Sequence, residues 1–269
     1  MRRIAHRTGG ASAGFILLLV LLAILARWLS GGDPNRLGDA IMQAPSWAHP
    51  FGTDDLGRDI LTGVLYGIRV SLTVGFLAAL AATCIGGIIG AVAGFYGGVV
   101  DLVFMRVSEL FQVVPSFIVA AVIIALLGAG LAQIVAVIAL LAWPQTARVM
   151  RGEVIRIRQL EFVDAVRCLG EPEFSILCRE IIPNAAAPML AVGTLLVGSA
   201  ILLEASLSFL GLSSPEVISW GRMLNNGQRY LFSAWWMSFF PGVAIMLTVL
   251  AFNLLGDAVG AALNPRSQS

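Results

Sequence analysis

The stretch VSLTVGFLAALAATCIGGIIGAVAGFYGGVV, residues 70–100, contains no charged residue and is long enough to cross a lipid bilayer. The rest of the chain has the same character, because 58% of its 269 residues are hydrophobic and only 12% are charged. Soluble domains usually carry about 25% charged residues, so this chain cannot cover itself with a water-exposed surface. The sequence therefore predicts an all-α integral membrane protein that forms one transmembrane domain, residues 1–269.

Five further stretches are apolar enough for a spanning helix, which needs about 20 residues. The uncharged run between Glu109 and Arg148 is too long for one crossing, and Gly128-Ala129-Gly130 is the natural place for a turn within it. The first stretch could instead be a secretory signal peptide, but no small-x-small cleavage pattern precedes Arg27. The six expected spans are residues 11–29, 70–96, 105–127, 131–147, 185–209 and 234–256.

The distribution of arginine predicts the orientation of the chain in the membrane. Six spans place both termini on one side, and the cytoplasmic side carries the excess of basic residues. The chain has no lysine, and its 17 basic residues are all arginine. With both termini in the cytoplasm, eleven arginines lie inside and six outside. We therefore expect an extracytoplasmic segment at residues 31–69 and a cytoplasmic loop at residues 148–183.

Missing residue types exclude several kinds of chemistry. Without lysine the chain has no P-loop and no Schiff base. No aspartate pair, H-E-x-x-H motif or serine-histidine pair lies within a span, which argues against an intramembrane enzyme, and a net charge of +1 gives no indication of nucleic acid. We expect no metal or cofactor on this chain. The candidate metal ligands are few and have no metal-site spacing: His6, His49, Cys84, Cys168 and Cys178.

The cytoplasmic loop, residues 148–183, mixes charged and apolar residues between two apolar spans. A short helix is expected from Glu161, ended by Gly170-Glu171-Pro172, and a second over Glu173–Ile182, ended by Pro183. A solvated amphipathic connector is one interpretation. Because the charges have both signs, binding to a lipid surface explains the loop poorly. A docking site for a cytoplasmic protein explains it better.

Several motifs resemble a known family. The residues EFVDAVRCLG (161–170) and IIPN (181–184) resemble the EAA loop of ABC-importer permeases, with Asp164 and Val166 in place of the usual glutamate and alanine. Nearly the whole chain resembles the C-type subunit of the dipeptide, oligopeptide and nickel permeases. The other matching stretches are HPFGTDDLGRD (49–59), GIRVSL (67–72), LSFLGL (207–212), SWG (219–221), AFNLLGD (251–257) and LNP (263–265).

This resemblance implies the transmembrane domain of a type I ABC importer in the inner or plasma membrane of a bacterium. It implies a heterodimer with a homologous B-type permease, two cytoplasmic ATPase subunits that bind ATP and Mg²⁺, and an extracytoplasmic substrate-binding protein. Di- or oligopeptides are the expected substrates, with nickel chelates, opines or oligosaccharides as alternatives. A secondary transporter is disfavoured, because ion coupling needs several ionisable groups at depth and Glu204 is nearly alone there.

The expected site residues fall into three groups. Glu204, with Ser208, lies inside a span, where a carboxyl group is costly, and we expect it to support the translocation path or its gate. Direct substrate contact and a purely structural role are the alternatives. Gly86, Gly90 and Gly94 recur at every fourth position, which predicts close helix packing. The resemblance implies the ATPase-coupling residues: Glu161, Asp164, Ala165, Val166, Arg167, Leu169, Gly170 and Pro183.

Two further groups of charges have simpler interpretations. Glu109 lies three residues from Arg106 and is expected to form an ion pair along a helix face. The charges of residues 54–59 could hold a cation. The solvated face of a short external helix, with Ile60 and Val64 on its apolar face, is the favoured interpretation. The charged residues concerned are Asp54, Asp55, Arg58 and Asp59.

Overall fold

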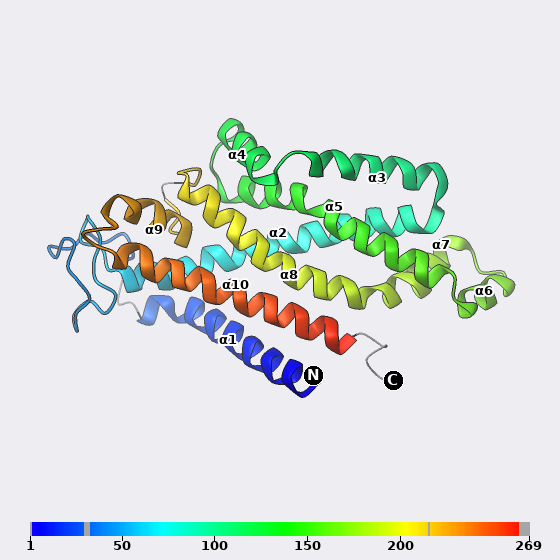
Figure 1. The fold of residues 1–269 in the computed structure, drawn as a ribbon, viewed down its shortest axis with the longest axis horizontal. Helices are drawn as coiled ribbons and strands as arrows, with labels where there is room; N and C mark the ends of the chain where they lie inside the picture. The colour runs from blue at the N-terminus through cyan, green and yellow to red at the C-terminus, as the bar shows by residue number, and fades with distance from the viewer. Residues whose placement is uncertain (1, 30–32, 215, 264–269) are drawn as a thin grey trace.

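The computed structural model describes residues 2–29, 33–214 and 216–263, with side chains from Thr8 onward. The end of the 263–265 motif and Arg266 lie outside these residues. Within them, long helices run roughly along one axis of an elongated molecule (Figure 1). Residues 33–59 and α9 (Trp220–Gly227) cover one end, and α6 (Glu161–Cys168) and α7 (Glu173–Ile176) form the other.

Five helical stretches of the described chain are long and apolar enough to cross a membrane by themselves. A sixth crossing requires α3 (Gly98–Val113) and α4 (Ser116–Leu127) to act together, although they are bent by 84°. The chain therefore offers five spans, or six if the bent pair counts as one. The five are α1 (Arg2–Leu29), α2 (Ile60–Tyr96), α5 (Leu131–Arg158), Glu173–Phe209, which ends in α8 (Ile182–Phe209), and α10 (Trp236–Leu263).

The third span expected over residues 105–127 is not one continuous helix. Val114 is extended (φ −94°, ψ 136°) and separates α3 from α4. A residue before proline avoids the helical region, and Pro115 has no N–H with which to continue the α3 hydrogen bonds. The turn expected at residues 128–130 does separate α4 from α5, and Gly128 there has φ 91°, which suits glycine.

Two other expected helix boundaries are corrected at the ends of the bundle. α2 begins at Ile60, so the expected external helix is its first part. Asp59 caps it, because the carboxylate accepts a 2.8 Å hydrogen bond from the Thr62 backbone N–H. Pro183 does not end a helix, because a π-helical turn, Leu177–Ile181, carries the chain from α7 into the first turn of α8. Proline is tolerated in a first turn, where its missing N–H matters least.

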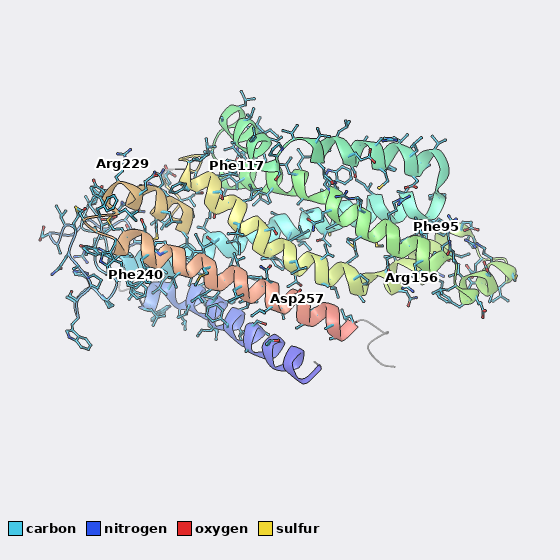
Figure 2. The ribbon with its side chains drawn as sticks, viewed as in Figure 1. Phe95, Phe117, Arg156, Arg229, Phe240 and Asp257 are labelled. Carbon is cyan, nitrogen blue, oxygen red and sulfur yellow. The ribbon has the colours of Figure 1, made fainter. Side chains whose placement is uncertain are left out.

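α2 forms the centre of the bundle. It packs against α5 on one side and α8 on another, while α1 packs against α10 (Figure 1). At the covered end, the buried Trp220 of α9 donates a 3.0 Å hydrogen bond to the Val64 carbonyl, and the Phe51 and Phe240 rings stack 4.0 Å apart. Figure 2 shows Phe240 at this end and Arg156 near the opposite one. The terminal ends of α1 and α10 both point towards the end that carries α6.

Candidate functional site

α6 and α7 form a compact projection at one end of the bundle, which we call the knob (residues 160–176) (Figure 1). Val163 of α6 is fully buried, and it packs with Ile157 of α5 and with Ile176 and Ile181 of the next helical stretch. Val166 is half-buried against the same cluster. The knob is therefore attached to two spanning helices through one continuous apolar core.

Polar contacts fix the turn of the knob. The Arg167 guanidinium donates hydrogen bonds to Glu173 at 3.0 Å and to Asp164 at 3.1 Å, and so joins α6 to α7. The hydrogen bond with Glu173, and then that with Asp164, raise the pKa of Arg167, so the guanidinium stays charged. Between the helices, Gly170 has φ 84°, a conformation that strains any residue with a side chain.

The exposed surface of the knob mixes apolar and acidic side chains. Leu169 is 83% exposed and Phe174 is 69% exposed, and Glu161 and Glu173 are exposed as well. Exposed Ala165 leaves room for a close approach. Sequence reasoning did not select Phe174, although its large apolar side chain follows the first residue of α7. Pro183 lies apart from this surface, in the first turn of α8.

Glu204 lies where α9 seats on α8. Its side chain is 1% exposed, and Oε1 accepts a 2.7 Å hydrogen bond from the Ser208 hydroxyl. Among the described residues, Oε2 has no hydrogen-bond partner. Ser219, which caps α9, lies close enough to interact electrostatically with the carboxyl group. Gly221 in the first turn of α9 packs directly on the α8 backbone, so the carboxyl group is enclosed.

The glycines of α2 lie where this helix meets α5. A Cβ atom on Gly86 would meet the side chain of Thr146, and one on Gly90 would meet the backbone carbonyl of Ala147. Gly94 approaches the backbone of Arg151 in the same way. The two helices therefore touch backbone to backbone at successive turns. This geometry accounts for the four-residue spacing by packing alone.

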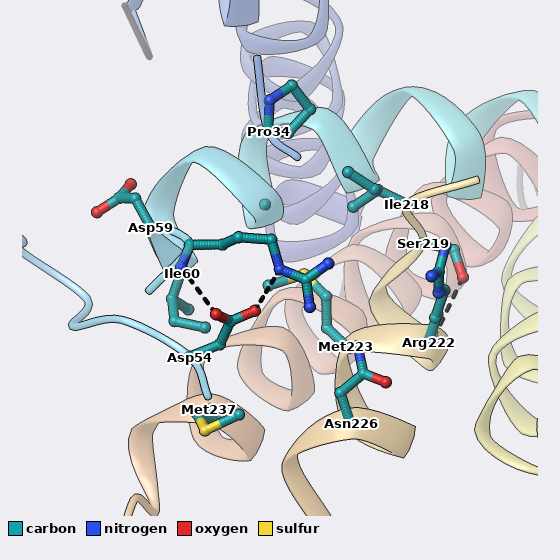
Figure 3. Close-up of a pocket in the computed structure, with 12 residues that line it drawn as sticks. Pro34, Asp54, Asp59, Ile60, Ile218, Ser219, Arg222, Met223, Asn226 and Met237 are labelled. Carbon is teal, nitrogen blue, oxygen red and sulfur yellow. Dashed lines mark hydrogen bonds and ion pairs between the residues drawn. The ribbon is translucent and has the colours of Figure 1, made fainter. Parts of the chain in front are cut away.

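The charges of residues 54–59 do not form a solvated helix face, which corrects the sequence interpretation. Asp54 is 6% exposed, and it accepts hydrogen bonds from the backbone N–H of Leu56 (2.9 Å) and the guanidinium of Arg58 (2.6 Å). A tight turn there needs an acceptor for its inward N–H groups, and Asp54 provides it. Figure 3 shows the adjoining pocket, where burial and then the nearby Arg58 lower the pKa of Arg222.

One smaller expectation also has an outcome in the structure. Arg106 and Glu109 form the expected ion pair, with 2.8 Å between the guanidinium nitrogen and the carboxylate oxygen, and both are exposed. Within the described residues, no group of three or more histidine, cysteine, aspartate or glutamate side chains is arranged to hold a metal ion.

Comparison with known proteins identifies the family. Residues 86–269 match the family of binding-protein-dependent transport system inner membrane components. The chain is 38% identical to a putative peptide transport system permease protein of Brucella abortus, over 98% of this chain and 90% of that protein. It is 39% identical to the dipeptide transport system permease protein DppC of Alkalihalophilus pseudofirmus, over 96% and 86%. It is 36% identical to the glutathione transport system permease protein GsiD of Pectobacterium atrosepticum, over 100% and 90%.

The fold is shared with a solved transporter. A chain of the MetNI methionine ABC transporter in an inward-facing conformation superposes with a TM-score of 0.62, covering 76% of this chain and 98% of that one, at 17% identity. The apolar helices and the relatives indicate a multi-pass membrane protein of a bacterial transport system. It is a transport subunit and not an enzyme, since separate ATPases hydrolyse the ATP in such systems. The chain belongs to the binding-protein-dependent transport system inner membrane components, as a permease subunit of an ABC importer.

Proposed function

We propose that this subunit imports di- or oligopeptides, in a heterodimer with a homologous B-type permease. Relatives named for peptide, dipeptide and glutathione transport support this substrate class. ATP and Mg²⁺ bind to two partner ATPases in the cytoplasm, and an extracytoplasmic binding protein delivers the substrate. Nickel chelates and other small solutes are the alternatives within the same mechanism.

In this proposal the bent pair forms the third of six spans, and both termini lie in the cytoplasm. The arginine distribution supports this orientation. It agrees with α1 and α10, whose terminal ends point towards the knob (Figure 1). The knob then lies on the cytoplasmic side of the inner membrane, and residues 33–59 with α9 lie outside.

The proposed mechanism rests on the structure of the knob. Leu169 and Phe174 offer apolar contacts to an ATPase surface, while Glu161 and Asp164 orient the contact by charge. Val163 is buried in an apolar core that the knob shares with two spanning helices. A displacement of the knob therefore moves those helices, and does not merely bend a loop. ATP-driven closure of the two ATPases then switches the permease pair between inward-facing and outward-facing states.

The test separates ATPase docking from transport. Gly170→Asp strains a left-handed position, and Ala165→Arg places a bulky charge on the docking face. Both variants should insert in the membrane and pair with the sister permease. Substrate uptake should nonetheless collapse, because the ATPases fail to dock or hydrolyse ATP without moving substrate. Pull-down of the ATPases and uptake are measured together.

A matched control is available on α5. Gly152 is exposed and has no neighbouring atom near the position of an added Cβ, so Gly152→Asp adds a charge outside the knob. It should retain docking and uptake. Normal uptake by Gly170→Asp or Ala165→Arg would remove the coupling role from the knob.

The orientation has its own experiment. Single cysteines replace Ser46, in the outer loop, and Ser175, in α7, in a background that lacks the three native cysteines. A membrane-impermeant maleimide applied to intact spheroplasts should label the first and not the second. Equal labelling of both would overturn the proposed topology.

A further inference from the structure

A cavity follows the bend between α3 and α4. It consists of two adjoining pockets that share Ser116, at the start of α4, and Gln145, on α5. One pocket extends along α3 and α5 to Gln112 and Arg148, and the other extends between α4, α5 and α8 to Ser199. Gln145 lies near the middle of α5, so the cavity lies about halfway along the bundle.

Polar side chains from several helices line part of this cavity, among apolar ones such as Val114 and Leu203. Gln112, Ser116, Gln145, Arg148 and Ser199 are all polar and all exposed in the isolated chain. Arg148 lies at the cytoplasmic edge of the expected span 131–147, but Gln145 and Ser199 lie inside expected spans. Polar groups that faced hydrocarbon there would be unfavourable. The cavity surface therefore faces something other than lipid.

Exposed positions turned away from the cavity give the contrast. Leu126 of α4 is 80% exposed, Leu140 of α5 is 44% exposed, and Leu190 of α8 is 61% exposed. These side chains suit hydrocarbon. The same helices thus carry apolar side chains on the side away from the cavity, whereas polar side chains of α3, α4, α5 and α8 meet at the cavity.

The backbone at the bend leads to the same conclusion. The last turn of α3 has carbonyl groups without helical N–H partners, and Pro115 supplies no N–H. Irregular backbone at membrane depth is tolerated where it is buried in protein or lines a water-filled cavity. Arg148 also donates a hydrogen bond to Gln112 in this last turn, which places a cation at the negative end of α3.

We infer that this cavity is the share of the translocation path contributed by α3, α4, α5 and α8, and that Gln145 and Arg148 contact the substrate in transit. For the substrate class, the inference rests on the proposed function. A glutamine amide both donates to and accepts from peptide groups, and a guanidinium binds a terminal carboxylate. The Arg148 guanidinium releases its hydrogen bond to Gln112 when it binds a substrate carboxylate. It bonds to Gln112 again once the substrate has passed, so the substrate is bound only transiently.

Thiol labelling tests whether the cavity is hydrated. Gln145→Cys and Ser199→Cys are made in a cysteine-free background, with Leu140→Cys and Leu190→Cys as controls on the same two helices. The whole complex in lipid nanodiscs reacts with 2-sulfonatoethyl methanethiosulfonate, a charged reagent, with and without trapped nucleotide. The cavity cysteines should react about tenfold faster than the controls in at least one state. Reaction as slow as the controls in both states would mean that lipid or a helix of the sister permease covers the surface.

Transport kinetics test the role of Arg148. The maximal uptake rate of a dipeptide at saturating binding protein should fall about tenfold in Arg148→Gln, because a charge-assisted contact is lost. Gln112→Leu removes the resting partner of Arg148 and keeps its charge, so this rate should fall less than about threefold. Exposed Arg106 provides the control, and Arg106→Gln should stay within about twofold of wild type.

The outcomes distinguish the role of Arg148 in the path from the proposed substrate class. Equal losses in Arg148→Gln and Gln112→Leu would mean that their contact is structural, which would overturn the role of Arg148 in the path. If the wild-type complex imports no peptide at all, the proposed substrate class fails. The thiol labelling would then still decide whether the cavity is the path.

Discussion

α2 and the bent pair α3–α4 both pack against α5, but they do so in different ways. α2 meets α5 through glycines, and its backbone touches the α5 backbone at Gly86 and Gly90. α4 packs on α5 through an apolar cluster that includes Ala120 and Ile124. α3, by contrast, meets α5 through long side chains, in the Asp101–Arg151 ion pair and the Arg148–Gln112 hydrogen bond, and it leaves a cavity. The contact of α2 has no room to slide, whereas that of α3 can change by rotation of side chains.

This difference divides the subunit into a rigid part and an adjustable part. Close-packed backbones resist displacement because any shift creates overlap. Contacts between long polar side chains survive a shift of the helices that carry them. We therefore expect α2 and α5 to move as one body during transport, while α3 changes its position relative to α5.

The largest expected effect comes from breaking the rigid contact. Gly86→Ala places a Cβ against Thr146 and the Trp143 carbonyl, and should destabilise the subunit by about 3 kcal/mol or more. At neighbouring Gly87 a Cβ would meet only the Met189 methyl group at 3.8 Å, so Gly87→Ala should be neutral or slightly stabilising. The melting temperature of the detergent-solubilised complex measures both. Equal melting temperatures for the two variants would contradict the rigid contact.

A smaller effect is expected at Glu204, which lies in the contact between α8 and α9. Glu204→Ala leaves the Ser208 hydroxyl without its partner and opens a cavity, at a cost of about 2 kcal/mol. Uptake of every accepted substrate should fall by a similar factor. Glu204→Gln keeps the shape and the acceptor, and should be much milder. A changed substrate preference at an undiminished rate would show that Glu204 selects the substrate instead.

The ion pair between α3 and α5 should contribute less. A double-mutant cycle with Asp101→Asn and Arg151→Gln measures their coupling, which we expect to be about 1 kcal/mol. High salt should reduce it only partly, because both side chains are partly buried. A coupling as large as the loss in Gly86→Ala would place α3 in the rigid part of the subunit.

The smallest expected change in stability is at the bend itself. Pro115→Ala removes the constraint on Val114, and should change the free energy of unfolding by less than about 1 kcal/mol. The angle between α3 and α4 should open, which spin labels at Val107 and Val122 report as a longer distance. An unchanged distance would show that packing of α4 sets the bend, and not the proline.

Part of this architecture could be predicted from the sequence. Uncharged runs located the five helices that are long and apolar enough to cross a membrane, because exposure to lipid selects for hydropathy. The glycine turn at residues 128–130 and the short helix from Glu161 to the glycine at 170 were also predicted, since each has a local backbone signal. The spacing of Gly86 and Gly90 indicated a close contact, but not which helix provides the other side.

The bend at Pro115 could not be predicted from hydropathy, because Val113, Val114 and Ser116 suit a straight span equally well. The pre-proline preference for extended backbone was the available signal. Hydropathy also missed the first part of α2, because Arg69 interrupts the uncharged run. In the structure its guanidinium donates hydrogen bonds to two backbone carbonyls of α1. The cavity at Gln145 required the fold, since its polar residues come from four helices and share no sequence pattern.

The stretch Glu173–Phe209 connects the two ends of the molecule as one helix of 37 residues, interrupted only by the π-helical turn. At about 1.5 Å per residue it is about 55 Å long. It starts in the knob and ends beside Glu204 beneath α9, so it acts as a lever arm. A tilt of about 5° about the knob end displaces the far end by about 5 Å over this length. In the proposed mechanism, the subunit would thus convert a small angular stroke of the ATPases into a movement of several ångströms at the far end of this helix.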